Sequence, residues 1–148
     1  MGLQRRILVP LSLSALVMFG LSWVWHGLAL NDLHDLTIPL GLYIALAAVA
    51  YLIIGAILTF SIHHAMANGW IDIRRAFPLK AMLYGAVVGF VVYLIALVFG
   101  MAFTGGKLMH MVVDVLWQMV EQCLGGLMVS LGIIYDLHKS FLENERAK

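Results

Sequence analysis

The sequence predicts an all-α integral membrane protein, a single domain in which four helices cross the bilayer up and down. Of the 148 residues, 63% are hydrophobic and 11% are charged, and the mean hydropathy is +0.97. This composition leaves too few polar side chains to cover a water-soluble domain. The apolar residues gather in four segments, each long enough to cross a hydrocarbon core of about 30 Å, which takes about 20 helical residues. The predicted spans are residues 7–30, 40–63, 81–104 and 111–135.

The first span has one competing interpretation, a cleaved signal peptide, because Arg5 and Arg6 precede an apolar run. The run is too long for the apolar region of a signal peptide. Trp23, Trp25 and His26 also occupy the positions where small residues would mark a cleavage site. The segment is therefore predicted to be a membrane helix.

The basic residues predict the orientation of the bundle. Eight of the nine Lys and Arg residues lie before the first span, between the second and third, or after the fourth, and only Lys107 lies on the other side. Basic loops stay in the cytoplasm, so both termini are predicted to be cytoplasmic, with residues 136–148 as a short tail. The two loops on the other side, residues 31–39 and 105–110, are short, which predicts antiparallel neighbours.

Small residues follow one face of the third span. Gly85 and Gly89 stand four residues apart, after Ala81. Small residues at this spacing let helix backbones approach closely in lipid. We expect this face to be a packing surface, used for other membrane subunits or for self-association. Nothing in the charge pattern indicates nucleic-acid binding.

The fourth span carries two acids, whereas the other three spans carry no charged residue. An Asp in the middle of a bilayer costs roughly 2.5 to 3.5 kcal/mol, so such residues face a partner, a cavity or the bundle interior. Counted from the outer boundary at 1.5 Å per residue, Asp114 lies roughly 5 Å deep and His26 roughly 6 Å deep. We expect these two side chains to meet, either as an interhelical hydrogen bond or as a pair that shares a proton.

Glu121 lies deeper, roughly 15 Å by the same count, close to the middle of the bilayer. Tyr51 on the second span and Tyr93 on the third fall at matching depth, and Gln118 lies one turn from Glu121. Two interpretations are open. Glu121 is part of a proton relay or orients a ligand, or it is a protonated acid that these neighbours satisfy.

The outer rim is a candidate metal site. Imidazole and carboxylate groups suit Zn, Cu, Fe or Mn, and at least three of them must converge. The candidate ligands are Asp32, His34, Asp35 and His110. A haem held by two histidines requires them to face each other at one depth, which only His26 and His110 approach. No cofactor follows from the spacing, and no hydrolase, redox or phosphate-loop motif is present, so the sequence leans away from an enzyme.

Two stretches, WVWHGLALND at residues 23–32 and DVLWQMVEQCLGGLMVSLG at residues 114–132, resemble small four-helix bacterial inner-membrane proteins classed as domains of unknown function. The resemblance covers the first and last spans. It implies the same fold, a location in the bacterial inner membrane and shared importance of His26, Asp114 and Glu121.

Three functions are left open by the sequence. The favoured one is a non-catalytic accessory or assembly subunit that packs in a larger membrane complex. The second is transport of protons or a small molecule along the polar line of His26, Asp114 and Glu121. The third is binding of metal or haem at the outer rim.

Overall fold

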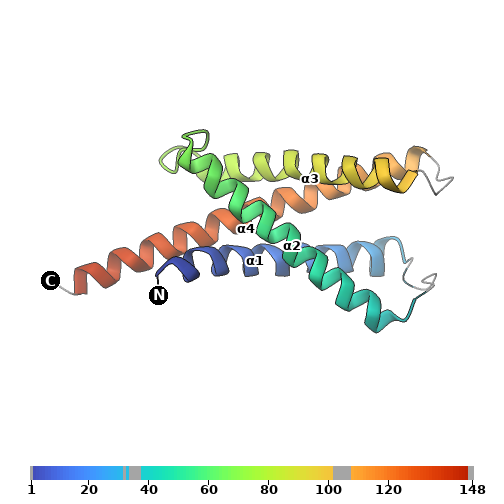
Figure 1. Cartoon of the computed structure of the whole chain (residues 1–148), viewed down its shortest axis with the longest axis horizontal. Helices are drawn as coiled ribbons and strands as arrows, with labels where there is room; N and C mark the ends of the chain where they lie inside the picture. Colours follow the sequence, from blue (N-terminus) through green and yellow to red (C-terminus); the bar gives the residue numbers. More distant parts are fainter. Residues whose placement is uncertain (1, 32, 34–37, 102–107, 147–148) are drawn as a thin grey trace.

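The computed structural model describes residues 2–31, 33, 38–101 and 108–146, and within them the chain is all-α (Figure 1). Each α-helix contains a segment long and apolar enough to cross a membrane. The prediction of an all-α chain with four helices of this kind is therefore confirmed for the described residues. The elements are α1 at Gly2–Val24, a turn of π-helix, η1, at Trp25–Ala29, α2 at Leu40–Ala67, α3 at Phe77–Met101 and α4 at Leu108–Arg146.

The helices extend beyond the predicted spans. α1 begins at Gly2, α2 ends at Ala67 and α3 begins at Phe77, each about four residues outside the prediction. α4 has 39 residues, which is about 58 Å at 1.5 Å per residue and almost twice a hydrocarbon core of about 30 Å. Residues 136–146, expected as a short tail, therefore continue α4. Hydropathy predicts where a helix leaves the hydrocarbon core. It does not predict where the helix ends, because the backbone hydrogen bonds of the helix continue beyond that boundary.

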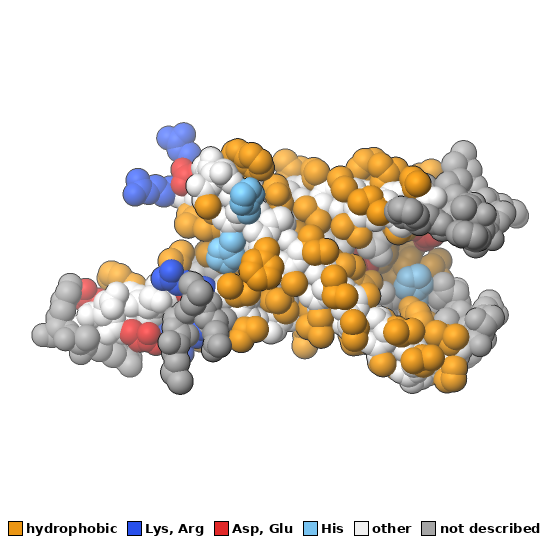
Figure 2. All heavy atoms as spheres, in the orientation of Figure 1, with side chains coloured by type: hydrophobic (Ala, Val, Ile, Leu, Met, Phe, Trp, Pro, Cys, Tyr) orange, Lys and Arg blue, Asp and Glu red, His pale blue; other side chains and the backbone are white. Residues whose placement is uncertain are grey.

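The molecule has an inner end, where both termini and the α2–α3 loop lie, and an outer end, where α1 leads into α2 and α3 into α4 (Figure 1). Figure 2 shows the described Lys and Arg side chains gathered at the inner end, while hydrophobic side chains cover the middle of this face. The basic residues that the sequence predicts on one side of the membrane thus also lie together at one end of the structure, as far as they are described.

α4 is the central helix of the bundle. It packs most extensively against α3 and α1, while α2 packs mainly on α1 and barely touches α3. The core between these helices lies in their inner halves. Its fully buried apolar side chains include Met18, Leu58, Ile62 and Val129, and Phe77 closes it at the inner end.

The small residues of α3 pack within the chain. A Cβ on Gly85 would run into the backbone carbonyl of Gln122, and a Cβ on Gly126 would run into that of Ala81. A Cβ on Gly89 would lie 2.8 Å from the backbone carbonyl oxygen of Gln118. The face that we expected to receive another subunit thus packs on α4 of the same chain. Association with other subunits or with a second copy of the chain stays a prediction.

Arginines of α1 hold the extension of α4 at the inner end. Arg5 Nε lies 2.8 Å from Asp136 Oδ1, and Arg6 Nε lies 3.3 Å from Asp136 Oδ2. Arg5 Nη1 lies a further 3.4 Å from Glu143 Oε1. The Asp136 side chain is only 5% exposed, so its charge is buried between two guanidinium groups. These ion pairs within the chain therefore stabilise the helical form of the segment after residue 135.

Pro10 in the interior of α1 explains an unusual contact of His63. Proline has no N–H, so the carbonyl of Arg6, four residues earlier, loses its helical donor. His63 Nε2 lies 3.4 Å from that oxygen. We assign the proton to Nε2, so that His63 donates the bond that Pro10 cannot. Pro10 is fully buried, and Gly132 of α4 leaves room for its ring.

We expect His63→Ala to lower the free energy of unfolding by about 1 kcal/mol, the usual contribution of one hydrogen bond. The same substitution should cost close to nothing in a Pro10→Ala background, where the alanine N–H restores the helical bond. A double-mutant cycle by reversible unfolding in mixed detergent measures both. An equal cost in the two backgrounds would show that His63 acts through something other than the Arg6 carbonyl.

Candidate functional site

The acids and amides of α4 form a polar line that begins near its outer end. Asp114 and Gln118 are half-buried, and Glu121 and Gln122 are fully buried. Residues three and four apart share one face of a helix, which places Asp114, Gln118 and Glu121 on a single stripe. The stripe turns toward the other helices, as the sequence predicts for charged groups in a membrane span.

Glu121 is a fully buried acid in α4. Its side chain has 0% exposure, and neither carboxyl oxygen completes a hydrogen bond with a described residue. The hydrogen-bond donors nearest to these oxygens are the Tyr51 hydroxyl of α2 and the Trp117 indole, one turn earlier on α4, and neither completes a bond of good geometry. Buried polar atoms in proteins are nearly always bonded. A carboxyl group left short of a bond is therefore a candidate for chemistry or ligand binding.

Tyr51 connects Glu121 to two other helical positions. Its hydroxyl interacts with Ser22 of α1 and with Gln118 of α4 as well as with Glu121. The phenol ring is 8% exposed and meets the Phe19 ring edge-on, with centroids 6.1 Å apart. Of the two tyrosines expected at this depth, Tyr51 is thus the one that faces Glu121.

Tyr93 instead meets Asp114. Its hydroxyl donates to Asp114 Oδ2 at 3.4 Å, which links α3 to α4 in the outer half of the bundle. The expected pairing of His26 with Asp114 stays a prediction, because the described bond of Asp114 is to Tyr93. His26 has interactions of its own within the structure.

η1 brings a second indole to the site. The hydrogen bond from Leu30 N to Trp25 O, 2.8 Å long, closes the wider turn of a π-helix, a form that often marks functional positions. Trp25 stacks on Trp117 with ring centroids 4.2 Å apart and planes 10° apart. Both indole nitrogens are buried without an acceptor among the described residues. Unused donors and unused acceptors therefore lie around the same stretch of α4.

Gln122 and two hydroxyls add further buried polar atoms. Both side-chain polar atoms of Gln122, the hydroxyl of Ser14 on α1 and the hydroxyl of Thr59 on α2 lack partners among the described residues. Ser130 is equally buried, yet its hydroxyl donates to the Leu127 carbonyl at 2.7 Å. Back-bonding of that kind is the usual solution for a hydroxyl inside a helix. Ser14 and Thr59 do not use it.

The core of the inner half of the bundle is mainly apolar. Met18, Leu58 and Val129 are each fully buried, and Val129 lies about 12 Å beyond Glu121 along α4. A Cβ on Gly125, one turn past Glu121, would lie 2.5 Å from the Met18 sulfur. The polar stripe of α4 is thus followed, toward the inner end, by a mainly apolar layer.

Sequence reasoning missed several members of the site. Trp117 precedes Glu121 by four residues and so shares its face, a spacing that was available in the sequence. Ser14 and Thr59 carried a weaker signal, as lone hydroxyls inside apolar spans. The stacking of Trp25 on Trp117 had no signal in the sequence, because it depends on the π-helical turn at Trp25.

Three of the four candidate ligands of the outer-rim metal site lie outside the described residues. Asp32, His34 and Asp35 lie outside the described residues, and His110 is described only as a residue of α4. Among the described side chains, no three His, Cys, Asp or Glu residues gather closely enough to hold a metal ion. The outer-rim metal site therefore stays a prediction.

Comparison of the chain with protein-family models, curated proteins and solved structures found no match. The resemblance to small four-helix inner-membrane proteins also stays a prediction. Functional inference therefore rests on the geometry of the bundle itself.

Proposed function

We propose that the chain is a non-catalytic integral membrane protein that takes up and releases protons at Glu121. One observation carries this proposal: a fully buried acid that has only the donors of Tyr51 and Trp117 near it and completes no hydrogen bond of good geometry with either. Ionised residues inside membranes are rare because they are costly, and many of those that persist belong to proton or ion pathways. A carboxyl group is the simplest carrier of a proton at such a depth.

The polar stripe supports access from the outer end. Asp114, Gln118 and Tyr93 are half-buried and lead along α4 toward Glu121. The apolar layer of Met18 and Leu58 separates Glu121 from the inner end. Net movement of protons would therefore require that layer to open, with Glu121 protonated from one side and deprotonated toward the other.

Proton flux into proteoliposomes tests the proposal. The purified protein is reconstituted around a pH-sensitive dye, and a pH gradient is imposed. We expect flux above that of empty liposomes in the wild type, and flux at the empty-liposome level in Glu121→Gln, which keeps the shape of the side chain but cannot ionise. Glu143→Gln is the matched control, because Glu143 is exposed on the extension of α4. Wild-type flux equal to that of empty liposomes, or unchanged flux in Glu121→Gln, contradicts the proposal.

A second candidate, an accessory or assembly subunit, is favoured by the packing of α2. Every buried residue of α2 lies at Tyr51 or beyond it, and earlier positions such as Leu42, Leu46 and Val49 are about half exposed. The outer half of α2 is therefore free to pack against lipid or against helices of another subunit. Purification in a mild detergent, followed by mass spectrometry of co-purifying proteins, tests this role. A monomer without stoichiometric companions would argue against it.

We also propose that both termini face the cytoplasm, in a bacterial inner membrane. Basic side chains at one end of the bundle support this orientation, and the resemblance of the first and last spans supports the location. In a Cys123→Ser background, Lys139→Cys should react with a membrane-impermeant maleimide in inverted vesicles and not in intact spheroplasts. Labelling in intact spheroplasts and not in inverted vesicles would show the opposite orientation.

A further inference from the structure

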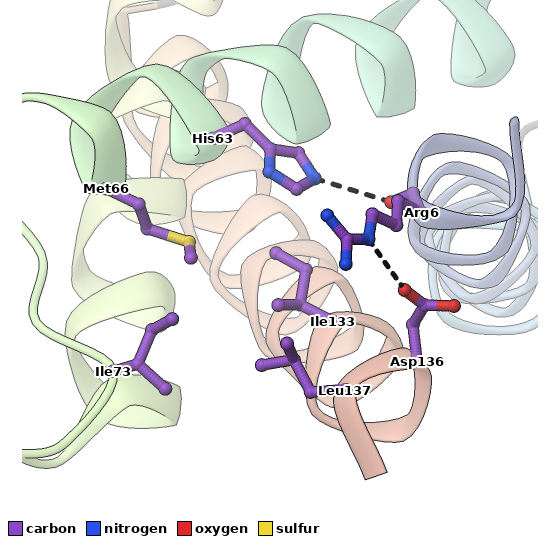
Figure 3. A pocket seen from close by; sticks show the side chains of 7 residues that line it. All are labelled: Arg6, His63, Met66, Ile73, Ile133, Asp136 and Leu137. Carbon is purple, nitrogen blue, oxygen red and sulfur yellow. Dashed lines mark hydrogen bonds and ion pairs between the residues drawn. The ribbon is translucent and has the colours of Figure 1, made fainter. Parts of the chain in front are cut away.

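A cavity of about 150 Å³ opens at the inner end of the bundle. Residues of α1, α2, the α2–α3 loop and α4 line it, and Figure 3 shows their side chains around a shared space. The lining residues are Arg6, His63, Met66, Ile73, Ile133, Asp136 and Leu137.

The cavity is amphipathic. Met66, Ile73, Ile133 and Leu137 supply apolar walls. The polar edge consists of Arg6, His63 and Asp136, whose carboxylate is paired with Arg5 and Arg6. In Figure 3 the guanidinium group of Arg6 lies between His63, Ile133 and Asp136. A ligand that fits these walls has an apolar part and an adjacent group that accepts hydrogen bonds from a cation.

Arg6 retains donors for such a ligand. Its Nε faces Asp136 Oδ2 at 3.3 Å, which uses one of the five N–H donors of a guanidinium. Asp136 is also held by Arg5 at the shorter distance of 2.8 Å, so its charge does not depend on Arg6 alone. The side chain of Arg6 is 55% exposed. Guanidinium forks suit phosphate oxygens, which they bind through two parallel bonds.

The depth of the cavity identifies the source of the phosphate. Arg6 stands directly before the first apolar span, and the cavity shares this level with the end of α2 at Ala67. This is the boundary where the phosphates of a lipid leaflet lie. Basic pockets between membrane helices on the cytoplasmic side bind anionic headgroups. Arg74 and Arg75 follow Ile73 in the same loop and add positive charge at that level.

We propose that this cavity binds an anionic phospholipid, with the phosphate on Arg6 and the glycerol and first acyl carbons against the apolar walls. The site is separate from Glu121 and does not depend on the proton hypothesis. His63 faces the same space, but its ring donates to the Arg6 carbonyl, so it shapes the cavity and is not required to contact the phosphate.

Native mass spectrometry of the intact chain in a neutral detergent tests the proposal. Wild type, Arg6→Gln, Ile73→Trp and Lys139→Gln are each titrated with phosphatidylglycerol, phosphatidylcholine and inorganic phosphate. Ile73 is 43% exposed at the rim, so Ile73→Trp fills the cavity without entering the core. Lys139 is exposed at the same end and controls for the loss of one positive charge.

We expect wild type and Lys139→Gln to retain phosphatidylglycerol in preference to phosphatidylcholine. Arg6→Gln should bind phosphatidylglycerol about tenfold more weakly, the effect of one charge-assisted hydrogen bond, and Ile73→Trp should lose the preference although its thermal stability is unchanged. Equal retention of the two lipids would overturn the proposal. So would binding of inorganic phosphate as tight as that of the lipid, or wild-type binding in either Arg6→Gln or Ile73→Trp.

Discussion

Gly85→Ala is expected to lower the free energy of unfolding by about 3 kcal/mol, at the upper end of what overpacking of a core costs. The added Cβ would fall on the backbone carbonyl of Gln122, close to the Cα of Gly126. A backbone atom cannot rotate away as the end of a side chain can, so α3 must move off α4. Reversible unfolding in mixed detergent, followed by far-ultraviolet circular dichroism, measures the loss.

Gly20→Ala is the matched control, because it makes the same chemical change inside a membrane span. A Cβ on Gly20 would have no described heavy atom within 4 Å. Alanine is favoured over glycine inside a helix, so this variant should be as stable as the wild type or slightly more so. If Gly85→Ala and Gly20→Ala unfold alike, the close approach of α3 to α4 is not what holds the bundle together.

The glycines of α3 also show what the sequence can predict about packing. Spacing of four residues identifies Gly85 and Gly89 as a contact face without naming the partner helix. On α4 the small residue that meets this face is Gly126, which packs on Ala81 and Gly85 of α3. The neighbouring Gly125 and Gly132 face α1 instead, so the spacing of glycines does not by itself identify the helix that each one contacts. Assigning the face to another subunit overlooked this local partner.

Hydropathy predicted the spans well because the cost of exposing charge to hydrocarbon is large and sums over many residues. It could not predict the helix ends. The inner extension of α4 depends on Arg5 and Arg6 reaching Asp136 across more than 120 residues of sequence, a contact without a local signature. The π turn at Trp25 is likewise set by packing, since its sequence does not exclude an ordinary α-turn.

The sequence identified polar residues of the site but not their pairing. Counting residues placed Tyr51 and Tyr93 level with Glu121, whereas in the structure Tyr51 interacts with Glu121 and Tyr93 bonds to Asp114, two turns earlier on α4. Which tyrosine faces which acid depends on the rotation of α2 and α3 about their axes. The apolar faces of α2 and α3 extend all around these helices, so the sequence contains little information about that rotation.

Glu121→Leu is expected to raise the free energy of unfolding by about 2 kcal/mol. Leaving a polar group buried without a bond costs about 1–3 kcal/mol, and leucine removes that cost while nearly keeping the volume. Only Tyr51 and Trp117 act on the carboxyl group, so few partners are stranded by its loss. Unfolding in mixed detergent measures the change, and circular dichroism confirms that the helical content is retained.

Asp114→Leu provides the comparison on the same helix. Asp114 accepts a hydrogen bond from Tyr93 across the α3–α4 contact, and its removal leaves a phenol without its described acceptor. We expect this variant to lose about 1 kcal/mol, so the two substitutions should change stability in opposite directions. A loss of stability in both variants would instead identify Glu121 as a structural acid with partners in the folded bundle.

The sign of the Glu121→Leu effect also decides between the two interpretations of this acid. If Glu121 is a protonated acid that only completes the core, Glu121→Leu should lower the free energy of unfolding, because Tyr51 and Trp117 would lose a partner. An acid that the chain carries at a cost to stability fits the trade-off in which active groups are kept in unfavourable surroundings. A bundle that becomes more stable and at the same time loses proton flux would connect the unfavourable position of Glu121 directly to its proposed role.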